Sequence, residues 1–237
     1  MNIGIDSVKK DLEELSDPLK AKILQRFFKT GKGQYGEGDI FLGIQVPISR
    51  KIARKYSSLK VDDVISLLKS PVHEERLVAL FIIVNQFEKG NEKIKENIFK
   101  KYLENTRYIN NWDLVDLSAD RIVGDYLYEK PRDILYILAR SANLWERRIA
   151  VMATFNFIKK GSFEDTLKIS SMLLNDSHDL IQKAVGWMLR EVGKRCSKEV
   201  LEEFLKSNYK KMPRTMLRYA IEKFPKELRQ NYLKVEI

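Results

Sequence analysis

Apolar residues recur at intervals of three and four along almost the whole chain, which is the pattern of amphipathic helices. The first such segment places Ile5, Val8, Leu12 and Leu15 on one face. No stretch alternates apolar and polar residues as a half-buried strand would. The pattern therefore predicts an all-α protein, with helices over residues 5–15, 18–29, 48–56, 61–69, 71–87, 91–105, 111–129, 132–140, 144–160, 163–174, 179–192, 197–208 and 213–223.

The ends of these helices carry recognisable signals. Asp17 followed by Pro18 is a start signal, because a capping residue stands before a proline at the first helical position. Gly90, Gly161 and Gly193 stand where C-terminal caps are expected. Residues 30–40 contain four glycines and no periodicity, which predicts a loop. A phosphate-binding P-loop is the alternative, but the Gly-Lys-Ser/Thr ending and a preceding strand are both missing.

Helices in pairs, repeating about every 35 to 45 residues, indicate a solenoid of HEAT or armadillo type. Segments 72–80, 143–151 and 178–187 share one pattern, a polar opening followed by an apolar run. Each run includes a small residue that lets neighbouring helices pack closely: Ala79, Ala150 and Ala184. We therefore predict a right-handed α-solenoid of HEAT-like repeats, forming a single domain over residues 1–237, whose second helices line a concave binding surface.

Composition excludes several classes of protein. The chain is 44% hydrophobic and 32% charged, and no apolar run approaches the roughly 20 residues that span a bilayer. Residues 1–10 lack the apolar core of a signal peptide. Cys196 is the single cysteine, so an intrachain disulfide is excluded, and with only His73 and His178 beside it we expect no metal or other cofactor. A cytoplasmic protein is the resulting expectation.

The net charge of +10 is spread unevenly. Residues 20–60 carry ten lysines and arginines against two acidic residues, and residues 181–237 carry fourteen against seven. Two basic ends around a nearly neutral middle favour a polyanion as partner, although a dispersed, solvated surface gives the same count. On the helix over 48–56, the candidate phosphate contacts are Arg50, Lys51, Arg54 and Lys55, reinforced by backbone amides of the preceding loop. The alternative for them is a solvated helix flank.

The stretch 110–116 concentrates the candidate chemistry. Trp112 and Asp116 are four residues apart, so a helix places them on one face. Asp113 is expected to share an edge of that face, while Leu114 and Val115 point into the core. Taken singly, such residues have ordinary structural explanations. Asp113 can favour the helix N-terminus, large aromatics such as Trp145 and Trp187 usually belong to the core, and Arg147-Arg148 is by default a surface pair.

Motifs over residues 18–225 resemble, in order and spacing, the AlkD-type DNA glycosylases, which repair alkylated bases and are built from HEAT-like repeats. The matching motifs are Phe41-Leu42-Gly43-Ile44 with Pro47 and Arg50, Trp112-Asp113-x-Val115-Asp116, Leu144-Trp145-x-x-Arg148, and Ile181-Gln182-Lys183-Ala184-Val185-Gly186-Trp187-x-Leu189-Arg190-Glu191. The resemblance implies that Asp116 is the catalytic aspartate, that Trp112 and Trp187 face the target nucleotide, and that Arg148 contacts phosphate. The chain departs from the family in the glycine-rich insert at 30–40.

The resemblance further implies hydrolysis of the N-glycosidic bond of N3- or N7-alkylated purines in duplex DNA, without flipping of the base into a pocket. The residues fit this chemistry, because a fixed carboxylate stabilises positive charge that develops on the deoxyribose and indole faces attract cations. Arg190 is a further phosphate candidate, and Asp113 and Arg147 are secondary site candidates. We expect a monomer acting on double-stranded DNA. Two alternatives stay open: a non-catalytic solenoid that binds bent or branched DNA, and a protein-interaction scaffold.

Overall fold

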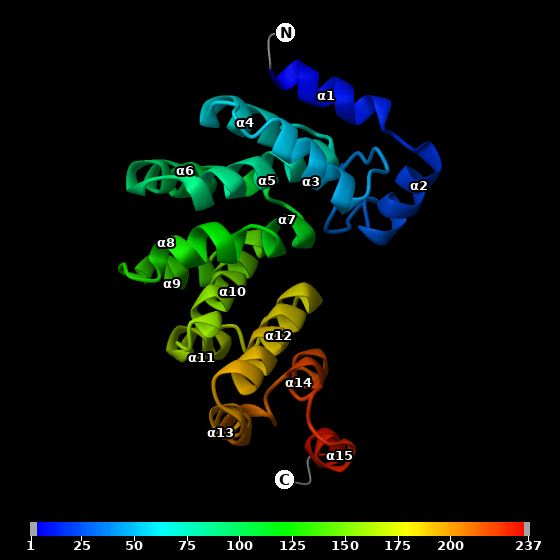
Figure 1. The fold of residues 1–237 in the computed structure, drawn as a ribbon. Helices are drawn as coiled ribbons and strands as arrows, with labels where there is room; N and C mark the ends of the chain where they lie inside the picture. Colours follow the sequence, from blue (N-terminus) through cyan, green and yellow to red (C-terminus); the bar gives the residue numbers. More distant parts are fainter. Residues whose placement is uncertain (1–3, 235–237) are drawn as a thin grey trace. The chain divides into compact units, whose positions relative to one another are not determined.

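A computed structural model describes residues 4–234, which fold mainly into helices, with a long irregular segment over 28–45 between α2 and α3 (Figure 1). The first three and last three residues of the predicted single domain lie outside this range. The chain forms two compact units, one ending at Ser118 and one beginning at Ala119. Within residues 4–234, β pairing is limited to an isolated bridge between Ile40 and Val72. No helix in that range is both long and apolar enough to cross a bilayer.

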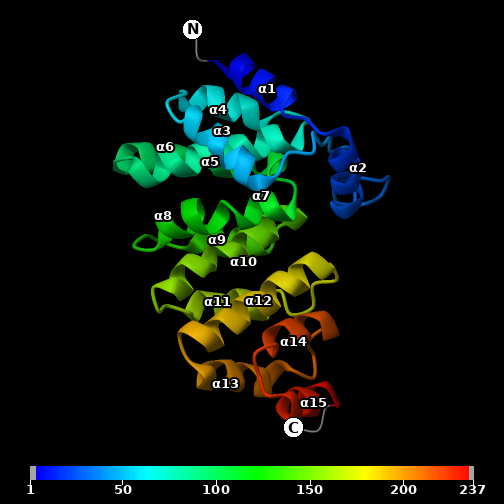
Figure 2. The same ribbon diagram turned by 45° about the vertical axis from the view of Figure 1, so that its right-hand side comes forward.

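The first unit is organised around α5. The helices α1, α3, α4 and α6 pack around α5 (Figures 1 and 2). A helix surrounded in this way needs apolar residues on nearly all sides, and residues Leu77 to Val84 of α5 are each at most 2% exposed. The bounds of the elements are α1 (Ile5–Glu14), α2 (Pro18–Phe27), α3 (Val46–Lys55), α4 (Val61–Leu68), α5 (His73–Lys89), α6 (Glu92–Glu104), the 3₁₀ turn η1 (Thr106–Tyr108) and α7 (Trp112–Asp116).

The second unit stacks successive helices around α10 and α12. α10 packs against α9, α11 and α12, and α12 packs against α13 and α14 (Figure 2). Such stacked helix pairs are what HEAT-like repeats consist of, so the predicted all-α fold class is confirmed. The elements are the π-helical turn η2 (Asp120–Gly124), α8 (Asp125–Leu127), α9 (Asp133–Ala139), α10 (Leu144–Lys159), α11 (Glu164–Met172), α12 (Asp179–Arg195), α13 (Lys198–Asn208), α14 (Arg214–Ala220) and α15 (Lys226–Lys234).

The predicted and observed helices differ most at two helix ends and in one additional helix. The helix expected over 111–129 stops at Asp116, and the chain continues through η2 and α8. At this break the Ser118 hydroxyl donates to the Leu114 carbonyl at 2.6 Å, a side-chain bond of the kind that competes with regular helix. Gly193 does not end a helix but lies inside α12, where a side chain would collide with Leu201. The helix α15 was not predicted.

Substituting Gly43 is expected to destabilise the first unit by about 3 kcal/mol. Gly43 has φ +86°, and a Cβ there would lie 2.3 Å from the Asp17 carbonyl oxygen. Left-handed backbone with a side chain costs about 1–2 kcal/mol, and overpacking adds about 1–3 kcal/mol. Gly33→Ala is the matched control, because Gly33 also has positive φ but faces open space. Urea unfolding of both variants measures the difference; equal losses for the two would contradict the role of close packing at Gly43.

Candidate functional site

The short helix α7 presents Trp112 and Asp116 on its less buried side. Both are half-buried, whereas the three residues between them are buried. At its start, the Asn111 side chain accepts a hydrogen bond from the Trp112 amide at 2.9 Å. At its end, Ser118 meets the buried Tyr102 hydroxyl at 2.8 Å. The indole and the carboxylate thus stand on one side of a helix that is fixed at both ends, as the four-residue spacing predicted.

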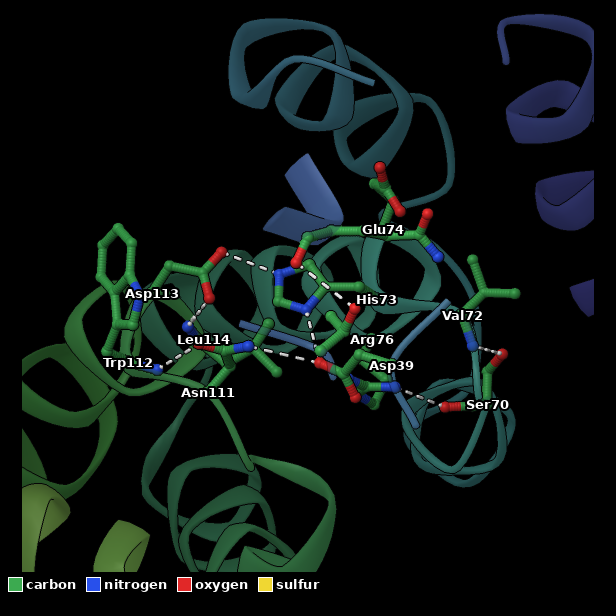
Figure 3. Close-up of polar contacts among 12 residues, drawn as sticks. Asp39, Ser70, Val72, His73, Glu74, Arg76, Asn111, Trp112, Asp113 and Leu114 are labelled. Carbon is green, nitrogen blue, oxygen red and sulfur yellow. Dashed lines mark hydrogen bonds and ion pairs between the residues drawn. The ribbon is translucent and has the colours of Figure 1, made fainter. Parts of the chain in front are cut away.

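Asp113 does not share that outer edge, so this part of the prediction is wrong. Its side chain points inward and is 7% exposed. One carboxylate oxygen accepts from the Leu114 amide at 2.9 Å, and the other lies 2.9 Å from Nε2 of His73 (Figure 3). The reason is that His73 offers a buried polar partner at the start of α5, on the side of α7 that faces the core.

Asp39, His73, Arg76, Asn111 and Asp113 form a buried polar cluster, and each is at most 7% exposed (Figure 3). Asp39 lies 3.2 Å from Nδ1 of His73 and accepts from Arg76 at 2.7 Å. The Asn111 amide donates to the same Asp39 carboxylate at 3.3 Å. Through Asp39, the cluster therefore ties the end of the glycine-rich insert to the start of α5 and the start of α7.

Burial and charge act in opposite directions on the cluster's titratable groups. Burial disfavours the imidazolium, but the charge and hydrogen bond of Asp113, with the bond to Asp39, raise the pKa of His73 to about 9. Burial also disfavours the ionised form of Asp39, yet the His73 hydrogen bond and the Arg76 charge hold the pKa of that carboxyl below its usual value. His73 and Asp39 are therefore both charged at neutral pH.

Glu74, the next residue of α5, fixes the loop that precedes α3. Its carboxylate accepts from the amides of Leu42, Gly43 and Ile44 at 2.9, 2.8 and 3.1 Å. The sequence predicted that amides of this loop reinforce phosphate binding. Because these three amides donate to Glu74, they belong to the internal structure, and the prediction is wrong for them.

A stack of aromatic rings runs from the cluster to Trp112. Phe41 stacks on His73 with ring centroids 4.4 Å apart, Phe28 stacks on Phe41 at 4.9 Å, and Trp112 stacks on Phe28 at 5.1 Å. Phe27 meets the Trp112 ring edge-on at 5.9 Å and is itself 62% exposed. The orientation of the indole is therefore set by packed rings and not only by its own helix.

The basic residues predicted on α3 occupy different environments. Lys51 and Arg54 are exposed. Arg50 is half-buried, and its guanidinium lies 4.1 Å from the centroid of the Phe81 ring, a cation–π contact. Lys55, next to them, is bonded to Asp11 at 2.5 Å. Lys51, Arg54 and Lys55 are thus the exposed members of this group, and Lys55 is paired with Asp11.

In the second unit, Arg147 and Arg148 lie at the start of α10 and are held by internal contacts. They are therefore not the solvent-exposed pair that two adjacent arginines usually form. Arg148 is 4% exposed, and its Nη1 donates to the Leu180 carbonyl at 2.5 Å, which ties α10 to the start of α12. Arg147 bonds to Asp176 at 2.7 Å and to the Ser141 carbonyl at 2.9 Å. Arg147 therefore fixes the turns that precede α10 and α12.

Trp187 is half-buried on α12, whereas Trp145 is 7% exposed and belongs to the core. The indole Nε1 of Trp187 donates to Glu191 at 3.3 Å, and Glu191 is buried and also accepts from Arg195 at 2.7 Å. Arg190, on the same helix, is paired with Glu222. The Trp187 ring is therefore oriented by a buried acid one turn along its helix.

The model of a protein family described as "DNA alkylation repair enzyme" matches residues 8–224. The chain belongs to this family. A solved structure described as "Predicted DNA alkylation repair enzyme from Enterococcus faecalis" has the same fold, with a TM-score of 0.68 and 17% identity over 89% of this chain and 97% of that chain. A search of curated proteins finds no match.

In this member of the family, sequence reasoning missed the residues that support the candidate site. The sequence marks His73 only as a possible metal ligand and Glu191 only as part of a motif, and it gives no sign that Asp39, one of the two acidic residues in 20–60, is buried. The sequence holds one signal for His73. It is the first polar residue of segment 72–80 and stands just before a long apolar run, so a buried side chain is consistent with its position. Its partners could not be found in this way, because Asp39 and Asp113 lie 34 and 40 residues away along the chain.

Proposed function

We propose that the chain is a monofunctional DNA glycosylase that hydrolyses the N-glycosidic bond of cationic N3- or N7-alkylated purines in duplex DNA. Membership of the family makes alkylated DNA the substrate to test. The observation that carries the proposal is the pair formed by Trp112 and Asp116, an indole and a carboxylate on the outer side of a firmly anchored helix.

The proposed reaction needs little from the protein besides electrostatics. The alkylated base carries a positive charge, so it departs with the bonding electron pair as a neutral molecule and needs no general acid. As the bond between C1′ and the base nitrogen breaks, positive charge develops on the deoxyribose, and the Asp116 carboxylate stabilises it. The oxygen of a water molecule then forms the new bond to C1′, and its proton passes to Asp116 or to solvent.

The remaining predicted residues have roles on the DNA around this step. The indoles of Trp112 and Trp187 attract the cationic sugar and base through their ring faces. Lys51 and Arg54, which are exposed, contact phosphates, and the half-buried Arg50 and Arg190 are further phosphate contacts. Arg148 is the phosphate contact that the family resemblance implies, but it is 4% exposed and bonded to the Leu180 carbonyl, which does not support this role. We propose that the base need not enter a pocket, and that the protein acts as a monomer in base excision repair in the cytoplasm.

Free base should be released when the protein is incubated with duplex DNA that contains 7-methylguanine or 3-methyladenine. The physical reason is that both bases leave as neutral molecules from a cationic nucleoside. Chromatography of the supernatant under single-turnover conditions measures the release. The matched control is the same duplex with uracil at that position, from which no release is expected because neutral uracil would depart as an anion.

The same experiment separates the alternatives when a binding titration is added. Salt-dependent DNA binding without release of either methylated base would contradict the glycosylase and favour a non-catalytic DNA-binding solenoid. Absence of DNA binding would contradict both and favour a protein-interaction scaffold.

A further inference from the structure

We infer that His73 is a positioning residue for α7: as a buried imidazolium held between Asp39 and Asp113, it fixes the helix that carries Trp112 and Asp116. His73 does not touch the proposed substrate and is 1% exposed. Its role in the reaction rests on the proposed glycosylase function, whereas its ionised state and its contacts can be measured without any reaction.

With Asp39 and Asp113 both ionised, the geometry requires both ring nitrogens of His73 to carry protons. Nδ1 lies 3.2 Å from an Asp39 oxygen and Nε2 lies 2.9 Å from an Asp113 oxygen. A neutral imidazole has one donor and one acceptor nitrogen, so one of its nitrogens would direct a lone pair at a carboxylate. Two N–H donors satisfy both carboxylates, and only the imidazolium has two.

The charges of the cluster point to the same state. With His73 protonated, two cations, His73 and Arg76, balance two carboxylates, Asp39 and Asp113. Loss of the His73 proton would leave one uncompensated negative charge in a site where every member is at most 7% exposed. The pKa of His73, raised to about 9, agrees with this balance.

The helix α7 depends on such anchors because it has only five residues. A helix this short does not hold itself together, since nucleation is costly and few hydrogen bonds follow. His73 reaches α7 by two routes. One is the hydrogen bond to Asp113, and the other is the ring stack through Phe41 and Phe28 to the Trp112 indole.

Both routes end next to the groups assigned to the chemistry. Asp113 follows Trp112 directly, and Asp116 lies three residues further along the same helix. A displacement of about 1 Å at a reacting group can slow a reaction by about 10²-fold. A change at His73 is therefore expected to slow the reaction while leaving the exposed DNA-contacting side chains in place.

Nuclear magnetic resonance tests the ionised state directly, because the chain has only two histidines. Imidazole ¹⁵N spectra of the full-length protein should show one ring, that of His73, with both nitrogens protonated at pH 7.5 and titrating near pH 9. His178 provides the contrast, since its Nδ1 accepts from the Leu180 amide at 3.2 Å and burial with nearby arginines lowers its pKa. His178→Gln assigns the signals. A His73 ring that is neutral at pH 7.5 would overturn the inference, whether or not the protein releases any base.

His73→Gln should slow single-turnover release of 7-methylguanine at pH 7.5 by at least tenfold, with less than a threefold change in DNA affinity. One amide cannot donate to two carboxylates, so α7 loses an anchor. His178→Gln is the matched control and should leave the rate within twofold of wild type. Circular dichroism at the assay temperature confirms that equal fractions are folded. A His73→Gln rate within twofold of wild type would overturn the inference.

The pH profile distinguishes positioning from general loss of structure, and it uses a second variant that keeps the packing. In the wild type, release should decline above pH 8 with the midpoint at which His73 titrates in the spectra. Asp113→Asn removes one carboxylate, so both midpoints should move together to lower pH. Midpoints that move apart would overturn the inference. If the wild type releases no base at all, the proposed function fails, and the spectra still decide the state of His73.

Discussion

Asp116→Asn is expected to slow release of 7-methylguanine from duplex DNA by about 10²- to 10³-fold. Removing one group that is aimed at developing charge costs about that much in other enzymes. Asparagine has nearly the same size and keeps the half-buried position on α7, but it carries no charge to stabilise the cationic sugar. Single-turnover release, measured at saturating protein, reports the chemical step.

Asp133→Asn is the matched control, because Asp133 is an exposed acid in the first turn of α9 and has no assigned role. Its rate should stay within twofold of wild type. Affinity of the Asp116→Asn protein for the same duplex should be equal or slightly higher, because a negative charge near DNA has been removed. A rate within threefold of wild type would show that Asp116 does not supply the charge and would remove the central part of the mechanism.

The parts of the fold that follow from local pattern could be predicted from the sequence. The repeated polar opening before an apolar run places the starts of α5, α10 and α12 within two residues, because capping and periodicity are properties of neighbouring residues. The break after Asp116 could not be predicted in this way. Apolar residues continue at helical intervals from 114 to 127, and the interruption arises from Ser118 and from a π-helical turn packed against α10.

In the candidate site, too, features set by neighbouring residues could be predicted, and features set by distant contacts could not. The placement of Trp112 and Asp116 on one side of α7 followed from their spacing of four. Asp113 was misplaced because its partner, His73, belongs to another helix, and a buried ion pair contradicts the local rule that charged residues face solvent. Arg148 and Arg147 were likewise expected at the surface, but the Arg148 guanidinium donates to the Leu180 carbonyl and the Arg147 guanidinium to the Ser141 carbonyl. Long-range polar contacts of this kind require coordinates.

Asp39→Asn is expected to destabilise the first unit by about 3–5 kcal/mol, the cost of breaking a buried ion pair by removing one partner. Asp39 is 5% exposed and bonds to both Arg76 and His73, so its loss leaves two buried cations facing one carboxylate. Asp62→Asn is the matched control. The Asp62 side chain is 81% exposed and pairs with Lys101, and such solvent-screened surface pairs contribute little to stability. Urea unfolding at pH 7 measures both, and equal losses would contradict a buried ionic network.

The pH dependence of the same measurement identifies the charges involved. The pKa of His73 is raised from 6.5 to about 9, so its stabilising contribution is complete below pH 6.5 and is lost as the pH rises through 9. The pKa of Asp39 is lowered from 3.8, so its contribution is present above pH 3.8 and is lost as the pH falls through the lowered value. Asp39→Asn removes the loss of stability that titration of Asp39 causes at acid pH. It also reduces the loss that titration of His73 causes at alkaline pH, because His73 then faces only the Asp113 carboxylate. The free energy of unfolding of the variant should therefore change less than that of the wild type between pH 7 and 9.5. An alkaline decline of the same size in both proteins would mean that groups other than the Asp39–His73 pair produce it.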